Sequence, residues 1–120
     1  MRIFENNLIF IEIHESEIPW LKIFTNRKIK EFSQATKEEK EAILKALDVI
    51  EKEMIAFFNP TKINIAQFGN YLPHLHWHIM ARFENDSYFP ESMWGKKQRE
   101  GTHKIKKLDE FVEKIKKILE

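Results

Sequence analysis

Three histidines alternate with apolar residues in the middle of this 120-residue chain, at positions His74, His76 and His78. In a strand, side chains two positions apart point to the same face, so the three imidazoles would form one row. A neutral imidazole is a good nucleophile near neutral pH, because its unperturbed pKa is about 6.5. Such a ring can attack an electrophilic phosphate to give a phosphoramidate, while its neighbours bind phosphate oxygens and protonate the leaving group.

Two other uses of the same residues stay open. His-x-His on a strand is a familiar pair of metal ligands, and His74 could supply the third protein ligand of a zinc ion. Three ligands in a straight row chelate a tetrahedral ion poorly, however. The histidines could also lie on a polar sheet face without any function. Gly69-Asn70 before the row and Arg82 after it favour a functional site.

The row needs a sheet, and the pattern predicts four strands for it. Residues 8–13 and 20–24 are rich in β-branched and aromatic side chains and predict an antiparallel hairpin. Residues 61–68 predict a third strand, and residues 72–83 predict the fourth, which carries the histidines. On that strand the alternating residues between the histidines, such as Leu75, Trp77 and Ile79, would point the other way, into a core.

Two helices are also predicted. Thr36 and Glu39 have the spacing of a capping box, and apolar residues follow at helical spacing until Asn59-Pro60 ends the helix. Residues 104–119 predict an amphipathic C-terminal helix with these residues on its apolar face: Ile105, Leu108, Val112, Ile115 and Leu119. Residues 84–103 lack clear periodicity, and loops of this length are often functional or partly disordered.

Composition narrows the class of protein. The length fits one domain over residues 1–120, and 20 basic against 19 acidic residues argue against a nucleic-acid binder that works by charge alone. There is no cysteine, no apolar run long enough for a membrane span, and no signal-peptide pattern at the start. We therefore expect a cytoplasmic protein that binds neither nucleic acid nor a membrane.

Residues 74–80 resemble the signature of the histidine triad (HIT) family, in which three histidines alternate with hydrophobic residues and two more hydrophobics follow. The resemblance extends to residues on both sides of the signature. Further residues similar to those of the family, and of a bacterial branch described as diadenosine tetraphosphate hydrolase-like, are Asn64, Gly69-Asn70, Pro73, Pro90 and Trp94-Gly95.

The resemblance implies an α+β, HIT-like fold: an antiparallel sheet of about five strands with a long central helix and a C-terminal helix, commonly paired in a homodimer. It implies a nucleotide hydrolase or transferase that acts on dinucleoside polyphosphates or nucleoside phosphoramidates. His76 would attack the α-phosphate and carry the nucleotidyl group, His78 would contact the phosphate and bridging region, and His74 would orient the neighbouring ring. No metal or other cofactor is required by this mechanism.

The resemblance also implies phosphate-binding residues. Asn64 and Asn70 would bind phosphate or leaving-group oxygens, and Gly69, Tyr71 and Leu72 would line the same pocket. Asn70 stands where the family usually has glutamine, and Tyr71 where a small hydroxyl residue is more usual. Both departures concern contacts with the leaving group, so they bear on the preferred substrate.

Other residues have two interpretations each. Arg82 shares the histidine face and could contact phosphate or form a salt bridge at the rim. Trp20 and Trp94 could line a nucleoside pocket or simply pack, and Trp77 is expected in the core. His14 and Glu15 lie at the first hairpin turn, where family members often contact ribose, and His103 is expected on the surface.

A nucleotide-binding or interaction module with little turnover is the alternative function.

Overall fold

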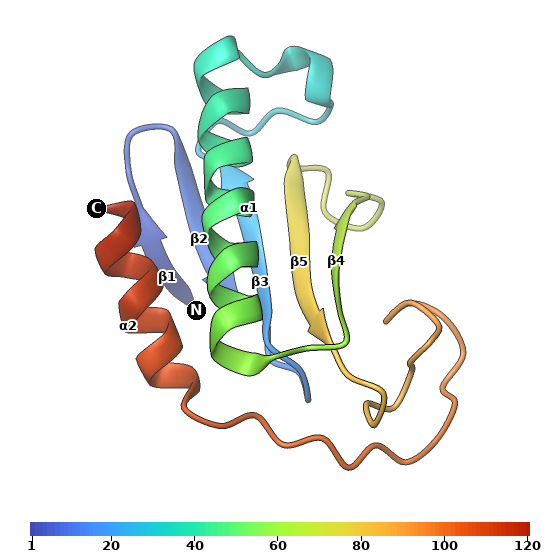
Figure 1. Ribbon diagram of the computed structural model, residues 1–120. Helices are drawn as coiled ribbons and strands as arrows, with labels where there is room; N and C mark the ends of the chain where they lie inside the picture. Colours follow the sequence, from blue (N-terminus) through green and yellow to red (C-terminus); the bar gives the residue numbers. More distant parts are fainter.

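The computed structural model describes residues 1–120 and contains a five-stranded antiparallel sheet with two α-helices (Figure 1). The strands are β1 (Arg2–Glu5), β2 (Ile9–Ile13), β3 (Trp20–Thr25), β4 (Lys62–Gln67) and β5 (His76–Arg82), and the helices are α1 (Lys37–Phe58) and α2 (Leu108–Leu119). The strand order is β1-β2-β3-β5-β4, so the histidine strand β5 lies between β3 and β4. The α+β fold expected from the sequence is confirmed. Neither helix is long and apolar enough to span a membrane.

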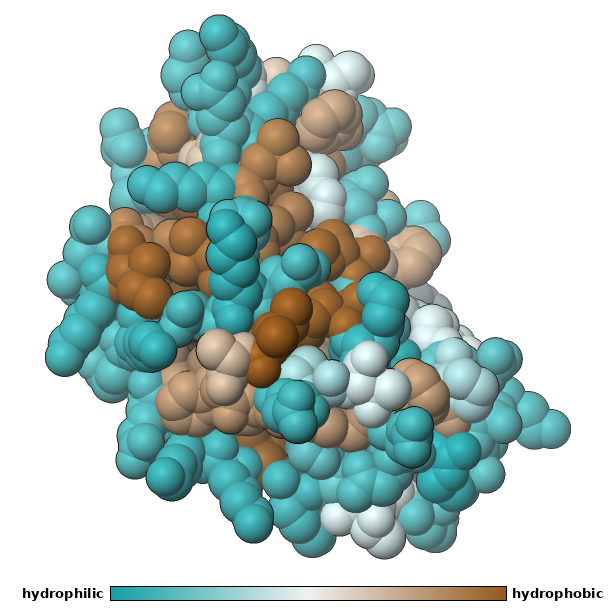
Figure 2. All heavy atoms as spheres, in the orientation of Figure 1, coloured by the Kyte–Doolittle hydropathy of each residue, from teal (hydrophilic) through white to brown (hydrophobic).

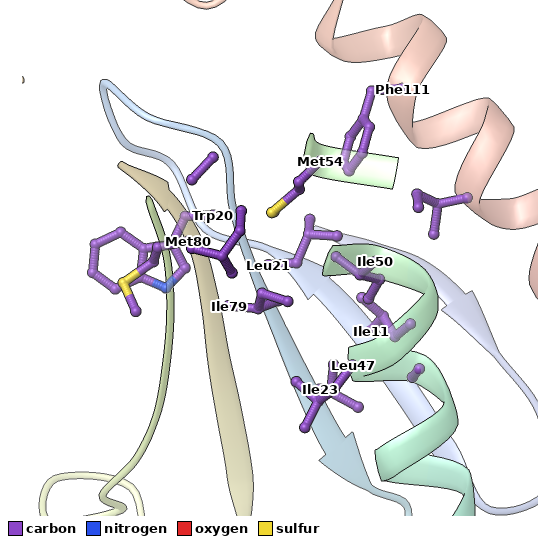
Figure 3. Packing of buried hydrophobic residues seen from close by; sticks show 14 of the residues in the cluster. Ile11, Trp20, Leu21, Ile23, Leu47, Ile50, Met54, Ile79, Met80 and Phe111 are labelled. Atoms are coloured by element: carbon purple, nitrogen blue, oxygen red, sulfur yellow. The ribbon is translucent and has the colours of Figure 1, made fainter. Parts of the chain in front are cut away.

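The two faces of the sheet have different surroundings. Figure 1 shows α1 lying across one face, with α2 beside it near β1. In Figure 3, Leu21 and Ile79 point from the sheet toward Ile50 of α1, whereas Trp20 and Met80 point to the opposite side. Leu21 and Ile79 are direct cross-strand partners and are fully buried. Strand alternation therefore gives the sheet a core face toward α1 and a second face that carries the histidines.

Helix α1 begins and ends where its sequence signals predict. The Thr36 N–H donates to the Glu39 carboxylate at 2.8 Å, and the Glu39 N–H donates to the Thr36 hydroxyl at 3.1 Å. Arg27 donates two further hydrogen bonds to the same carboxylate. At the other end Asn59 adopts a left-handed conformation with φ of 48°, directly before Pro60.

Strand β5 begins at His76, four residues later than predicted, and this corrects the expectation of three histidines on one strand. Pro73 has no N–H to donate to a ladder. The His74 N–H instead donates to the Leu72 carbonyl at 2.8 Å, which closes a tight turn. The ladder can begin only after this turn, so His74 lies outside the strand and only His76 and His78 share its face.

Two other elements depart from the prediction. The edge strand β1 was not indicated, because it has only four residues and pairs with β2 alone. Helix α2 begins at Leu108 rather than residue 104, after Lys107 in a left-handed conformation. Its fully buried residues are Phe111 and Ile115, and Phe111 was absent from the predicted apolar face. Figure 3 shows Phe111 next to Met54 of α1.

The segment of residues 84–103 has no helix or strand but is tied to the rest of the molecule. The Asp86 carboxylate accepts hydrogen bonds from the N–H groups of Phe83, Tyr88 and Phe89. The N–H and the hydroxyl of Ser87 each donate to the Glu17 carboxylate at 2.8 Å. The bonds to Glu17 hold the segment against the turn between β2 and β3. From this point the segment continues to the histidine face of the sheet.

Candidate functional site

His76 and His78 lie side by side on the face of β5 that points away from α1. Across the β3–β5 ladder, Phe24 pairs with His76 and Lys22 pairs with His78. The Phe24 ring stacks on the His76 ring with 4.7 Å between centroids, and the two imidazoles are 4.9 Å apart. Both histidines are more than nine-tenths buried, with 6% and 8% of their surface exposed.

The hydrogen bonding of His76 determines which ring nitrogen is free. Its Nδ1 lies 2.6 Å from the backbone carbonyl of His74. A carbonyl oxygen can only accept, so Nδ1 carries the proton and the neutral ring has its lone pair on Nε2. Burial lowers the pKa of His76 from its usual value, which favours the neutral ring. His76 therefore has the protonation state that a nitrogen nucleophile requires.

His78 has the opposite tautomer. The indole N–H of Trp20 donates to Nδ1 of His78 at 3.0 Å. An indole nitrogen is a donor only, so Nδ1 of the neutral ring accepts and Nε2 carries the proton. Burial, followed by the neighbouring His76, lowers the pKa of His78 to about 4. His78 is thus a neutral hydrogen-bond donor at pH 7, next to a ring with a free lone pair.

His74 contacts the pair through its backbone rather than its ring. Its carbonyl accepts the bond from His76, while its own Nε2–H donates to the Thr25 carbonyl at 2.6 Å. The ring lies against the edges of Phe10 and Phe24, at 5.9 and 5.2 Å between centroids. His74 is therefore part of the support of the nucleophile, and its side chain lies outside the cavity described next.

A cavity of about 350 Å³ opens in front of His76 and His78. Its remaining lining comes from residues 68–72, which join β4 to β5, and from His14, Lys22 and Trp94. The predicted Gly69, Asn70 and Tyr71 thus meet the two histidines at one cavity, whose volume is that of a small-molecule site. Gly69 has φ of 80°, a conformation that favours glycine and that turns the loop at the rim.

Asn64 and Arg82 lie outside this cavity. The Arg82 guanidinium is 1% exposed and donates to the Asp86 carboxylate at 3.0 and 3.2 Å and to the Asn64 side-chain oxygen at 2.9 Å. Burial alone would raise the pKa of Asp86, but these bonds and three from backbone N–H groups lower it to about 2. Of the two interpretations of Arg82, the structure favours the salt bridge, which is buried rather than at the rim and involves all three guanidinium nitrogens together with the bond to Asn64.

Two aromatic residues left undecided by the sequence contact His78. Trp94 packs edge-on against the His78 ring at 4.8 Å and against Phe68 at 4.8 Å. Trp20 bonds to His78 as described, and its ring also lies 4.0 Å from that of His14 and 5.3 Å from that of Trp94, between centroids. No periodicity in the sequence places Trp94 here, because the long segment of residues 84–103 brings it back.

Three further residues have positions that can be compared with the expectations. Lys22 lines the cavity and was not singled out, although alternation along β3 from Trp20 would have placed it on the histidine face. His103 was expected on the surface but stacks on Phe83 with 3.7 Å between centroids. Trp77 faces away from the histidines and is only partly buried against the core.

No group of three or more His, Cys, Asp or Glu side chains is arranged to hold a metal ion. The ring of His74, which the three-histidine metal hypothesis requires, points to the Thr25 carbonyl instead.

Comparison with known proteins is consistent with this geometry. The HIT domain model matches residues 3–85, which include His74, His76 and His78 and all of the sheet except Arg2. The chain belongs to the HIT family. No protein of curated function matches the sequence significantly.

Solved structures of HIT proteins have the same fold. A histidine triad protein of Bradyrhizobium japonicum superimposes with a TM-score of 0.81 and 22% identity, over 100% of this chain and 90% of that one. One of Marinobacter aquaeolei gives 0.82 and 21%, with the same coverage. The diadenosine triphosphate hydrolase of Plasmodium falciparum gives 0.64 and 19%, over 98% and 73%.

Proposed function

We propose that this HIT protein is a nucleotide hydrolase or transferase that forms a covalent nucleotidyl intermediate on His76. Its substrates would be dinucleoside polyphosphates or nucleoside phosphoramidates. The observation that carries the proposal is the pair of opposite tautomers: a free Nε2 lone pair on His76 beside an Nε2–H on His78, at one cavity. The Plasmodium falciparum relative, a diadenosine triphosphate hydrolase, supports the same class of reaction.

The proposed reaction has two steps. In the first, Nε2 of His76 attacks the α-phosphorus, a P–N bond forms, and the bond to the leaving group breaks with its electron pair on the leaving group. The Nε2–H of His78 donates to the phosphate or bridging oxygen as charge develops there. In the second, water attacks phosphorus, the P–N bond breaks, and the nucleotide leaves with the water oxygen while the water proton is released. Another acceptor in place of water would make the enzyme a transferase.

The supporting residues have separate roles in this scheme. The His74 carbonyl holds the proton of His76 on Nδ1, so that Nε2 stays available for attack. Asn70 and Tyr71 line the cavity, are exposed at its rim, and would contact the leaving group. Asn64 would act indirectly, through its bond to Arg82. The mechanism requires no metal or other cofactor.

The test is chromatography of a diadenosine polyphosphate and an adenosine phosphoramidate after incubation with wild type, His76→Ala and the control His103→Gln. We expect His76→Ala to lose at least about a thousandfold of kcat, because the nucleophile acts in the rate-determining chemistry. His103→Gln should retain turnover, because His103 lies outside the cavity. Equal turnover by wild type and His76→Ala would contradict the mechanism.

A nucleotide-binding module with little turnover is the second candidate, and the same cavity supports it. It predicts nucleotide binding without an adenylyl-protein detectable by mass spectrometry.

We also propose a cytoplasmic homodimer. Strand β4 is at an edge of the sheet and has no partner on its outer side. Large apolar side chains are exposed near it on Ile65 and along α1 on Leu44 and Ile55. Figure 2, viewed from the α1 side, shows apolar atoms gathered between the charged side chains. A second copy could cover such a surface.

A further inference from the structure

Lys22 has no role in the mechanism above, yet it lies within the candidate site. It is on β3, directly opposite His78 in the ladder, between the cross-strand partners of Met80 and His76. Its side chain is half-buried and lines the same cavity as His76 and His78. The charge of Lys22 is among the causes that lower the pKa of His14, His76 and His78. The Lys22 ammonium nitrogen lies 5.8 Å from the centre of the Phe24 ring, which in turn stacks on His76.

The cavity has one permanent charge, and it is positive. None of its lining residues is an aspartate or glutamate, and its two triad histidines are neutral at pH 7. Glu12 is opposite Lys22 on β2, but Lys22 is in none of the ion pairs of the chain. An ammonium without a carboxylate partner in a small-molecule cavity favours an anionic ligand.

We propose that Lys22 binds an anionic leaving group, so that the site prefers phosphoric anhydrides of nucleotides to nucleoside phosphoramidates. The inference rests on the proposed function and narrows its substrate class. Lys22 lies beside His78, which donates to the phosphate or bridging oxygen, and in an anhydride the bridging oxygen departs as part of the leaving group. The ammonium would thus lie near the group that leaves rather than behind the nucleophile.

The two leaving groups differ in charge. When the P–O bond of an anhydride breaks, the electron pair leaves with a nucleoside phosphate whose negative charge increases, and an ammonium stabilises that charge in the transition state. When the P–N bond of a phosphoramidate breaks, the electron pair leaves with the nitrogen, which takes up a proton from solvent water and departs as an amine. Lys22 gains nothing from a neutral amine and repels a cationic one.

The experiment compares kcat/KM for a diadenosine polyphosphate and for an adenosine phosphoramidate with a lysine-like amine. The variants are Lys22→Met, which keeps length without charge, Lys22→Arg, which keeps charge, and the control Lys45→Met on the exposed side of α1. We expect Lys22→Met to lower the anhydride-to-phosphoramidate ratio by about tenfold or more, as loss of one charge contact to phosphate. For Lys22→Arg and Lys45→Met, the anhydride-to-phosphoramidate ratio should stay close to that of wild type.

A second readout does not depend on turnover. In the His76→Ala background, calorimetry compares ADP, whose β-phosphate represents the leaving group, with AMP. We expect ADP to bind at least about fivefold more tightly, and the further change Lys22→Met to abolish that difference. Added salt should weaken ADP binding more in the protein that retains Lys22.

The outcomes separate the two proposals. If Lys22→Met leaves the anhydride-to-phosphoramidate ratio of kcat/KM unchanged, the inference is overturned. This holds whether both kcat/KM values stay the same or both fall equally, and an equal fall would mean that Lys22 acts through the histidines. If wild type turns over neither substrate but the ADP preference depends on Lys22, the proposed function fails while recognition of an anionic phosphate by Lys22 stands. If there is neither turnover nor an ADP preference, both proposals are overturned.

Discussion

His76 and His78 are chemically identical side chains whose hydrogen-bond partners give them different roles. A carbonyl can only accept and an indole N–H can only donate, so each partner permits one tautomer of a neutral ring. Burial keeps both rings neutral, as their lowered pKa values indicate. The result is a lone pair and a proton side by side at pH 7, which two equivalent histidines on an open strand would not provide.

The role of Trp20 is testable at this scale. In Trp20→Phe, Nδ1 of His78 loses its donor, and the neutral form loses about 1 kcal/mol of stabilisation. We expect the pKa of His78 to rise from about 4 by roughly 0.5 to 1 unit. Nitrogen-15 NMR over a pH titration measures both the tautomer and this pKa.

The matched control for Trp20→Phe is Trp94→Phe, because Trp94 also contacts the His78 ring but donates no hydrogen bond to it. This control should leave the His78 tautomer unchanged. A wild-type spectrum with the proton of His78 on Nδ1 would refute the assignment.

At the scale of elements, the start of α1 shows how a helix cap is joined to the sheet. Thr36 and Glu39 form the capping box, and Arg27, which follows β3, donates to the same buried carboxylate. The Arg27 hydrogen bond is the largest of the causes that lower the pKa of Glu39 from 4.5 to about 2. The cap therefore ties α1 to the end of the strand that carries Lys22.

This cap predicts a pH-dependent contribution to stability. Because the pKa of Glu39 is lower in the folded protein, its stabilisation is present above about pH 5 and is lost as the pH falls toward 2. We expect Glu39→Gln to reduce the free energy of unfolding by about 1–2 kcal/mol at pH 7, a value discounted because Arg27 is half-exposed. Urea unfolding at several pH values measures this difference.

The difference between wild type and Glu39→Gln should shrink as the pH falls below about 5 and should approach zero only at about pH 2. Glu38→Gln is the control, because Glu38 lies in the same first turn but is exposed. A difference that stayed constant from pH 7 to pH 2.5 would show that the charge of Glu39 does not contribute.

At the scale of the whole molecule, the layers leave the histidine face of the sheet free of helices. Both helices pack on the opposite face (Figure 1). The segment of residues 84–103, held by the bonds between Ser87 and Glu17, brings Trp94 to the histidine face. The edge of β4 and the exposed apolar residues near it remain uncovered in one chain.

The proposed dimer is tested by sedimentation equilibrium. We expect wild type at twice the 14.5 kDa mass of one chain, and the double variant Leu44→Glu with Ile65→Glu at the mass of one. The two glutamates would be buried without partners in a dimer interface, which opposes association. In the monomer both positions are exposed, so the fold of one chain should be unaffected. Ile118→Glu on α2, also at an exposed apolar residue, should remain dimeric. A monomeric wild type would contradict the proposal.

Local patterns were sufficient to predict most of the elements. Alternation predicted that His76 and His78 share a strand face, and the capping box and Pro60 predicted both ends of α1, because each depends on neighbours within a few residues. Gly69, Asn70 and Tyr71 were expected near the histidines through the resemblance to the HIT family rather than through a local pattern, and they line the same cavity.

Contacts between distant residues decided the rest. The Pro73 turn and the Thr25 carbonyl remove His74 from the row. Asp86 and Asn64 together accept a hydrogen bond from each of the three guanidinium nitrogens of Arg82, and Trp20 selects the tautomer of His78. The pairing of β3 with β5 likewise puts Lys22 opposite His78. Periodicity specifies a face, but partners for polar groups on that face come from segments up to 58 positions away, and only the folded chain determines which of them meet.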